Sequence, residues 1–390
     1  MVSSFEFSGV PQIVFGPGSI VKLPSVIKKY GRSVLIITGA SSFDSSVKGK
    51  ALLTALESEN LLIHRARIEK EPSPDNIDEI TEKFFNKDIN VIAAIGGGSA
   101  MDTGKAVSAM ILSGEKVKDY LEGIGSKIHT GLKLPFIAIP TTSGTGSEAT
   151  NNAVISEIGE KGFKRSLRHD NFVPDYAIVD PELILKCNPE ITAASGMDAF
   201  SQLLESYLSV EASLFTDSLA VEALRCISIC LPEVFNNGSD LKARTGMAYA
   251  AMISGITLSN AGLGLVHGFA SALGGYMDIP HGIVCGTLMG AVNRRNVEML
   301  CDYDNGNIAF RKYVTAGKIF ISDNNRSAEY YAKKFVDYID ELIVTMNLPR
   351  LGKYGLKAGQ IDKITGATRL KNNPVLLDKA DLQNILLSRI

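Results

Sequence analysis

The chain has 390 residues, of which 45% are hydrophobic and 21% charged, and its net charge is −2. This composition is that of a folded globular protein and excludes extensive disorder, while the length predicts two domains rather than one core. A near-neutral balance without a basic run excludes nucleic acid and an anionic membrane surface as expected partners.

The first half of the sequence alternates between apolar runs and helical patterns. The N-terminal segment, with Phe5, Phe7 and the apolar residues 13–15, favours a strand or hairpin. Further apolar runs that predict strands lie at residues 34–37, 91–95, 135–139 and 176–179, and residues 61–68 also predict a strand. Helical spacing occupies residues 47–59 and 75–86 between them. This alternation predicts a parallel sheet with helices on both faces.

After about residue 183 the strand-like runs end and helical spacing dominates. We therefore expect an α/β domain over residues 1–184 and an all-α domain over residues 185–390. The uncharged stretch 245–277 contains many glycines, which favours buried, tightly packed helices over a membrane span. The start of the chain does not resemble a signal peptide, and five cysteines without a CxxC motif fit a reducing, cytoplasmic setting.

Two loops follow predicted strands and suit a phosphate. Three glycines at residues 96–98 lead into a helix, where the backbone can approach a ligand closely and free N–H groups attract an anion. The loop 140–148, rich in hydroxyl groups, follows the next strand. A tight turn and a capped helix start are the alternative interpretations. Because parallel strands end at one edge of the sheet, both loops are expected there, where ligands bind.

Polar residues recur in the helical half at spacings that suit a metal. Asp198, Gln202 and Glu205 share one helix face, which is either solvated or buried with a partner. His267 and His281 fall in or beside the uncharged glycine-rich stretch and are either hydrogen-bonded core residues or ligands. One carboxylate and two imidazoles suit Fe²⁺ or Zn²⁺.

Together these stretches resemble the iron-containing alcohol dehydrogenase family over nearly the whole chain. The matching segments occur in the family's order and with similar spacing, at 96–99 with Asp102 and Lys105, 140–148, 196–199, 263–268 and 280–282. The resemblance implies a nucleotide-binding α/β domain followed by a helical, metal-binding and catalytic domain, a dehydroquinate synthase-like architecture. It also implies a homodimer or larger homo-oligomer.

The resemblance assigns roles to individual residues. The metal would lie on Asp198, His267 and His281, which are then the catalytic residues. The cofactor would contact Gly97, Gly98, Ser99, Asp102, Thr141, Thr142, Thr145 and Lys164, although Lys164 would equally suit a solvated surface position.

Two positions depart from the family pattern. Gln202 stands where the family usually has a histidine as fourth metal ligand, and an amide oxygen is a weaker, neutral ligand. The site would then use three protein ligands and water, prefer zinc over iron, or bind metal loosely. Ser271 replaces a further histidine that is common in alcohol-oxidising members. If that histidine relays protons, Ser271, a water or the cofactor ribose would substitute.

The loop after the strand 34–37 bears on the cofactor. NAD-binding folds usually place an acid there for the ribose 2′-hydroxyl, but this chain has no acid until Asp44. Gly39, Ser41 and Ser42 leave room and donors for a 2′-phosphate. The loop therefore favours NADP(H), with NAD also possible.

The expected function is hydride transfer between NAD(P)(H) and a small alcohol or aldehyde, with a divalent metal, Fe²⁺ or Zn²⁺, polarising the substrate oxygen. One alternative is a superfamily lyase that uses bound NAD without net redox, but the basic phosphate-binding cluster it needs is not visible in the sequence. The other is a catalytically decayed nucleotide-binding sensor, suggested by Gln202 and Ser271. Net turnover of NAD(P)H separates the dehydrogenase from both.

Overall fold

The computed structural model describes the chain in four stretches, at residues 4–39, 43, 45–303 and 306–390. Its contacts divide it into two compact units. The α/β unit comprises Ser8–Glu157 and Lys164–Cys187. The helical unit comprises Asn188–Ile390 together with Ile158–Phe163 and the described residues up to Phe7.

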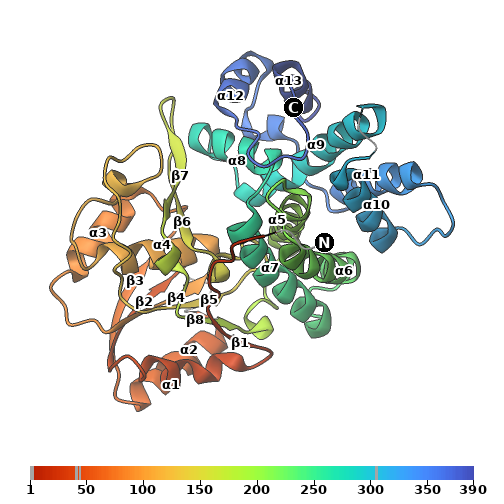
Figure 1. The fold of residues 1–390 in the computed structure, drawn as a ribbon. Helices are drawn as coiled ribbons and strands as arrows, with labels where there is room; N and C mark the ends of the chain where they lie inside the picture. The colour runs from red at the N-terminus through yellow and green to blue at the C-terminus, as the bar shows by residue number, and fades with distance from the viewer. Residues whose placement is uncertain (1–3, 40–42, 44, 304–305) are drawn as a thin grey trace. The chain divides into compact units, whose positions relative to one another are not determined.

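The α/β unit is built on a six-stranded sheet in the order β1-β8-β5-β4-β2-β3, in which every neighbouring pair is parallel. The strands are β1 Gln12–Phe15, β2 Ser33–Thr38, β3 Leu62–Arg67, β4 Val91–Gly96, β5 Phe136–Pro140 and β8 Tyr176–Val179. The helices are α1 Leu23–Ile27, α2 Val47–Ser58, α3 Pro74–Phe84 and α4 Gly98–Met110. Helices α1 and α2 cover one face, and α3 and α4 cover the other (Figure 1). The predicted parallel α/β fold is confirmed.

The central strands are almost entirely apolar in sequence because helices cover both faces of the sheet. All residues of β2, β4, β5 and β8 are buried. The chain passes from β2 outward to β3, then returns to form β4 on the other side of β2. The carboxyl ends of β2 and β4 therefore flank a topological switch point, which is the usual ligand position in such sheets.

Helix α4 approaches the sheet closely where Gly104 faces it. A Cβ atom at Gly104 would lie 2.6 Å from the ring of Phe136 and 2.7 Å from the Cβ of Ala94. No side chain fits between helix and sheet there. This contact fixes the position of α4, and with it the glycine loop at the start of the helix.

Strands β6 Asn152–Glu157 and β7 Phe163–Arg168 form a separate two-stranded sheet that the sequence did not predict. Most of β7 is only partly buried and it carries Lys164, Arg165 and Arg168, so it lacks the apolar run that marked the other strands. The expected N-terminal strand exists as β1, which pairs with β8 at the edge of the sheet. The hairpin alternative is therefore wrong.

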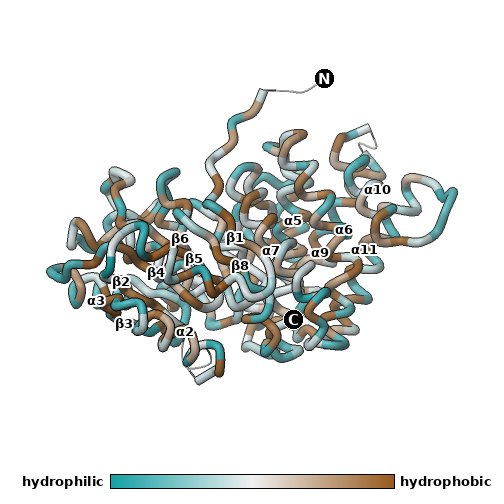
Figure 2. Tube along the Cα trace, turned by 90° about the horizontal axis from the view of Figure 1, so that it is seen from below, coloured by the Kyte–Doolittle hydropathy of each residue, from teal (hydrophilic) through white to brown (hydrophobic). Residues whose placement is uncertain are grey.

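The helical unit contains the expected helices, and within its described residues from Asn188 onward no strand occurs. They are α5 Pro189–Leu208, α6 Leu214–Asn236, α7 Leu241–Ala261, α8 Leu265–Tyr276, α9 His281–Tyr303, α10 Ile308–Phe320, α11 Ala328–Thr345, α12 Ile361–Ala367 and α13 Lys379–Leu387. Hydrophobic and hydrophilic residues alternate along many of them, as helices packed on one face require (Figure 2). The predicted all-α second domain is confirmed.

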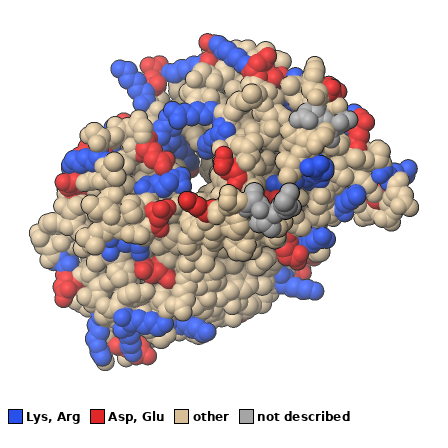
Figure 3. All heavy atoms as spheres, viewed as in Figure 1, with Lys and Arg blue, Asp and Glu red and all other residues tan. Residues whose placement is uncertain are grey.

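The uncharged stretch forms most of α7 and all of α8, which are largely buried. Among the described helices, none is by itself long and apolar enough to cross a membrane. Only α7 and α8 taken together reach that length and hydropathy, and they are bent by 96° at the break between them. On the face shown in Figure 3, acidic and basic side chains are interspersed, in keeping with the small net charge.

The close contact of α4 with the sheet predicts that Gly104→Ala destabilises the α/β unit. The added methyl group overlaps Phe136 and Ala94, which costs about 1–3 kcal/mol despite the better helix propensity of alanine. The control is Gly366→Ala in α12, where the methyl group meets nothing and changes stability by no more than about 1 kcal/mol. Urea unfolding of both variants measures the difference, and an unchanged midpoint for Gly104→Ala would contradict the close approach.

Candidate functional site

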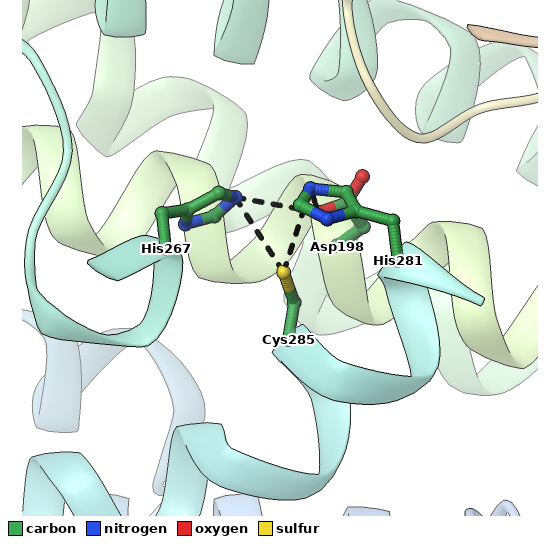
Figure 4. A group of neighbouring side chains, drawn as sticks. All are labelled: Asp198, His267, His281 and Cys285. Atoms are coloured by element: carbon green, nitrogen blue, oxygen red, sulfur yellow. Dashed lines mark hydrogen bonds and ion pairs between the residues drawn. The ribbon is translucent and has the colours of Figure 1, made fainter. Parts of the chain in front are cut away.

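Four potential ligands converge inside the helical unit, as Figure 4 shows. Asp198 comes from α5, His267 from α8, and His281 and Cys285 from α9. His281 and Cys285 are four residues apart, so they project from the same face of their helix. One ligand atom from each of the four residues lies within 4.8 Å of the others.

The spacing of the carboxylate and the imidazoles suits a single cation. Oδ1 of Asp198 lies 3.5 Å from Nε2 of His267 and 3.6 Å from Nε2 of His281. Around a tetrahedral zinc ion with ordinary bond lengths, nitrogen and oxygen ligands stand about 3.4 Å apart. Both oxygen–nitrogen distances are therefore within a few tenths of an ångström of those between ligands of one zinc ion.

Asp198 is the side chain of the cluster whose burial a cation would compensate most directly. It is only 2% exposed, and its Oδ1 accepts no hydrogen bond from the described residues. Burying a carboxylate oxygen without a partner is costly, whereas a metal ion at the centre of the cluster would satisfy it. The residues present thus fit a divalent metal. The side chain of His281 is 24% exposed, which leaves the cluster open to solvent on that side.

The charges of the cluster are coupled. Burial would raise the pKa of Asp198, but the neighbouring His281 and the contact with His267 outweigh it and hold that pKa below its usual value. Burial likewise opposes charge on His267, yet its polar neighbours raise the pKa well above normal. Contacts with Cys285, Asp198 and Glu205 raise the pKa of His267 and favour a proton on its ring, while burial raises the pKa of Cys285 to about 11. Metal binding at His267 must displace that proton.

Glu205 orients the imidazole of His267 through Nδ1, the ring nitrogen that does not face the cluster. Its Oε2 lies 2.7 Å from Nδ1 of His267, and its Oε1 accepts a hydrogen bond from the backbone N–H of Val266 at 2.6 Å. A carboxylate on Nδ1 fixes the tautomer of a histidine ligand and leaves Nε2 for the metal. Asp198, Gln202 and Glu205 are between 2% and 6% exposed, so their helix face is buried and not solvated.

The two positions that depart from the family pattern make local hydrogen bonds. Oε1 of Gln202 accepts one from the hydroxyl of Ser254 at 2.7 Å, which engages the atom that an amide would offer to a metal. The hydroxyl of Ser271 donates to the backbone oxygen of His267, one turn earlier, at 2.8 Å. Ser271 is thereby tied to its own helix.

Sequence reasoning missed Cys285, because it treated the cysteines as buried thiols. All five cysteines are free of disulfides, and Cys285 is fully buried. The available signal was its spacing, since a histidine and a cysteine four residues apart on a helix can bind one metal.

In the α/β unit the loops after β2, β4 and β5 meet at one edge of the sheet. The backbone N–H of Gly39 donates to the oxygen of Ile95 at 3.4 Å, and that of Thr141 donates to the oxygen of Gly96 at 2.8 Å. Ser41 lies outside the described residues. This edge therefore brings together Gly39, the glycine loop at residues 96–98 and the threonine loop at residues 141–148, beside the switch point.

The threonines pack directly on the glycines. A Cβ atom at Gly97 would lie 3.5 Å from the side chain of Thr142, and one at Gly98 would lie 2.7 Å from that of Thr145. Helix α4 begins at Gly98 without a side-chain cap, so the N–H groups of its first turn, including that of Ser99, are the anion-attracting end of the helix. An uncapped helix start beside threonine side chains is an arrangement that suits a phosphate group.

Asp102 and Lys105 hold the threonine loop from α4. The carboxylate of Asp102 accepts hydrogen bonds from the hydroxyl of Ser147 at 2.5 Å and the N–H of Val154 at 3.1 Å. Lys105 is fully buried, and its Nζ donates to the backbone oxygen of Ser147 at 2.8 Å and the hydroxyl of Thr150 at 2.7 Å. Both residues thus shape the loop that carries Thr145.

Lys164, on β7, is not a solvated surface residue. Its side chain is 8% exposed, and its Nζ contacts both carboxylate oxygens of Glu71, at 2.9 and 2.7 Å. This ion pair joins the small two-stranded sheet to the segment after β3.

The chain matches known proteins over almost its whole length. Residues 11–181 match the family described as iron-containing alcohol dehydrogenase, and residues 192–390 match the C-terminal domain of the Fe-containing alcohol dehydrogenase family. The NAD-dependent methanol dehydrogenase of Bacillus methanolicus is 34% identical over 70% of this chain and 71% of the relative. Long-chain-alcohol dehydrogenase 1 of Geobacillus thermodenitrificans is 30% identical, with 96% of both chains covered.

Solved structures show the same fold. The alcohol dehydrogenase from Oenococcus oeni superposes with a TM-score of 0.89 at 29% identity, covering 99% of this chain and 100% of that one. The sulfoacetaldehyde reductase from Bifidobacterium kashiwanohense, in complex with NAD⁺, superposes with a TM-score of 0.85 at 26% identity, covering 99% of each chain.

The contact between Glu205 and His267 predicts that Glu205→Gln weakens metal binding by about 10–100-fold, because the amide orients the imidazole less firmly and makes it a poorer donor. Competition with a chromogenic chelator measures the affinity for Zn²⁺. Glu222→Gln, on the exposed side of α6, is the control and keeps the wild-type affinity. Equal affinity in Glu205→Gln and wild type would show that Glu205 only supports the fold.

Proposed function

Since the chain belongs to the iron-containing alcohol dehydrogenase family, we propose that it transfers a hydride between NAD(P)(H) and a small alcohol or aldehyde, with a divalent metal at Asp198, His267 and His281. The observation that carries this proposal is the buried Asp198 carboxylate, whose Oδ1 faces two imidazole nitrogens and has no hydrogen bond from the described residues.

When bound, the metal supplies Lewis-acid polarisation of the substrate oxygen and the nicotinamide supplies the hydride chemistry. The chain's own residues supply the positions. Asp198, His267 and His281 hold the cation, and Glu205 keeps the ring of His267 aligned. The exposure of His281 provides the side from which a small substrate reaches the centre.

The proposed cofactor site lies on the carboxyl edge of the sheet. Gly97, Gly98 and Ser99 present backbone N–H groups to the pyrophosphate at the start of α4. Thr141, Thr142 and Thr145 add hydroxyl groups beside them. Asp102 acts on this site through Ser147 and the loop, and Lys164 through its ion pair with Glu71, so both are positioning residues.

We propose NADP(H) as the preferred cofactor. Gly39 occupies the place where NAD-binding folds usually have an acid. In the sheet register Arg67 stands opposite Thr38, so a basic residue ends the strand beside this loop. The methanol dehydrogenase is named as NAD-dependent and the reductase structure contains NAD⁺, so both cofactors need to be compared. The homodimer or larger oligomer implied by the family stays a prediction.

The proposal predicts that chelator-stripped protein loses aldehyde reduction and regains it with Zn²⁺ or Fe²⁺. A panel of small aldehydes, assayed with NADPH and NADH by loss of the reduced nicotinamide absorbance, measures this turnover. Asp198→Asn stays inactive with metal because the carboxylate ligand is lost, and Glu222→Gln is the control.

Each contrary outcome of this assay would contradict a different part of the proposal. Full activity of the stripped protein would remove the metal from the mechanism. Cofactor binding without turnover of any aldehyde would favour the lyase or the sensor. A kcat/KM at least tenfold higher with NADH would contradict the interpretation of the Gly39 loop.

A further inference from the structure

Cys285 lies in the metal cluster, although no ligand role was expected for it. It follows His281 by one turn of α9, is fully buried, and points its sulfur at both imidazoles (Figure 4). Its Sγ lies 3.6 Å from Nε2 of His267 and 3.7 Å from Nε2 of His281.

These separations are the ones a sulfur ligand needs. A zinc–sulfur bond is longer than a zinc–nitrogen bond, so sulfur and nitrogen ligands of a tetrahedral zinc ion stand about 3.6 Å apart, against about 3.4 Å for two nitrogens. The sulfur–nitrogen distances at Cys285 match the larger value, while the oxygen–nitrogen distances at Asp198 are 3.5 and 3.6 Å. Four of the separations among the ligand atoms are thus close to those around one zinc ion, and all four atoms lie within 4.8 Å of one another.

Gln202 is poorly placed to complete the same set. Its Oε1 is already hydrogen-bonded to the buried hydroxyl of Ser254, and an amide oxygen carries no charge to offset a divalent cation. The position on α5 where the family usually has a histidine ligand thus holds a weak donor, while α9 offers a thiol at ligand distance.

We propose that Cys285 is the fourth protein ligand of the metal centre, so that the ligand lost from α5 at Gln202 is replaced by a thiolate from α9. On binding, the S–H bond breaks, the proton passes to solvent and the sulfur donates an electron pair to the cation. Asp198 and Cys285 together then neutralise the charge of the ion. A set of one thiolate, two imidazoles and one carboxylate favours zinc over iron.

This inference rests on the proposed metal centre and is tested with cobalt as a spectroscopic probe. Full-length protein is stripped with chelator and titrated with Co²⁺, which gives an intense near-ultraviolet charge-transfer band only when a thiolate is a ligand. Wild type shows the band at one Co²⁺ per chain. Cys285→Ser loses the band and binds Co²⁺ at least tenfold more weakly.

Two control variants test whether Cys285 binds the metal or only lies beside it. Gln202→Ala keeps the band and an affinity within about threefold of wild type, because the amide is not a ligand. Cys230→Ser, which changes a half-buried cysteine of α6, keeps the band as well. In the Cys285→Ser background, Gln202→His restores the affinity without the band, because an imidazole returns on α5.

Zinc X-ray absorption of the wild-type protein tests the ligand without any substitution. One sulfur at about 2.3 Å from the zinc ion is expected. Bound Co²⁺ without the band, or zinc without a sulfur neighbour, would overturn the role of Cys285 and leave the metal-dependent dehydrogenase intact. Failure of the wild type to bind Co²⁺ or Zn²⁺ would overturn the metal centre itself.

Discussion

A buried carboxylate without a hydrogen bond is unstable unless a positive charge lies beside it, and Asp198 is in that position. The surrounding helices place positively polarised side chains next to this carboxylate. Helix α5 brings the carboxylate inward, α8 and α9 bring His267 and His281 to meet it, and Glu205 fixes one imidazole. A divalent ion would balance the carboxylate charge of the cluster, and in the proposed function the same ion would polarise the substrate oxygen.

The α/β unit meets a different constraint, which in the proposed cofactor site is the close approach of backbone to a ligand. Its glycines serve this in two ways. Gly104 lets α4 press against the sheet, and Gly97 and Gly98 leave the helix start open beside the threonine loop. Lys105 supports that loop from within the core. The proposed cofactor site therefore depends on packing inside the unit as much as on the residues that would face the cofactor.

Much of the fold could be predicted from the sequence, because strands buried on both faces of a parallel sheet form continuous apolar runs. These runs gave four strands of the main sheet, β2, β4, β5 and β8. The small sheet could not be predicted, since three of the six residues of β7 are charged and most of the strand is only partly buried. Its ion pair between Lys164 and Glu71 depends on how distant segments fold together.

The candidate site was predictable to a similar degree. Asp198, His267 and His281 stood out by residue type and by family resemblance, and the structure brings them together. The role of Asp102 in holding a loop could not be read from its motif, because both of its partners lie far along the chain. Cys285 escaped notice because a thiol on an apolar helix has the same pattern whether it fills space or binds a metal.

Thermal unfolding of wild type and Asp198→Asn, each with and without saturating Zn²⁺, tests the central claim most directly. If the carboxylate needs the cation, Zn²⁺ raises the midpoint of the wild type by several degrees, since a ligand that binds only the folded state stabilises it. Asp198→Asn then gains far less from Zn²⁺, because the carboxylate ligand is lost. Equal stabilisation of both proteins by Zn²⁺, or none of either, would contradict the account.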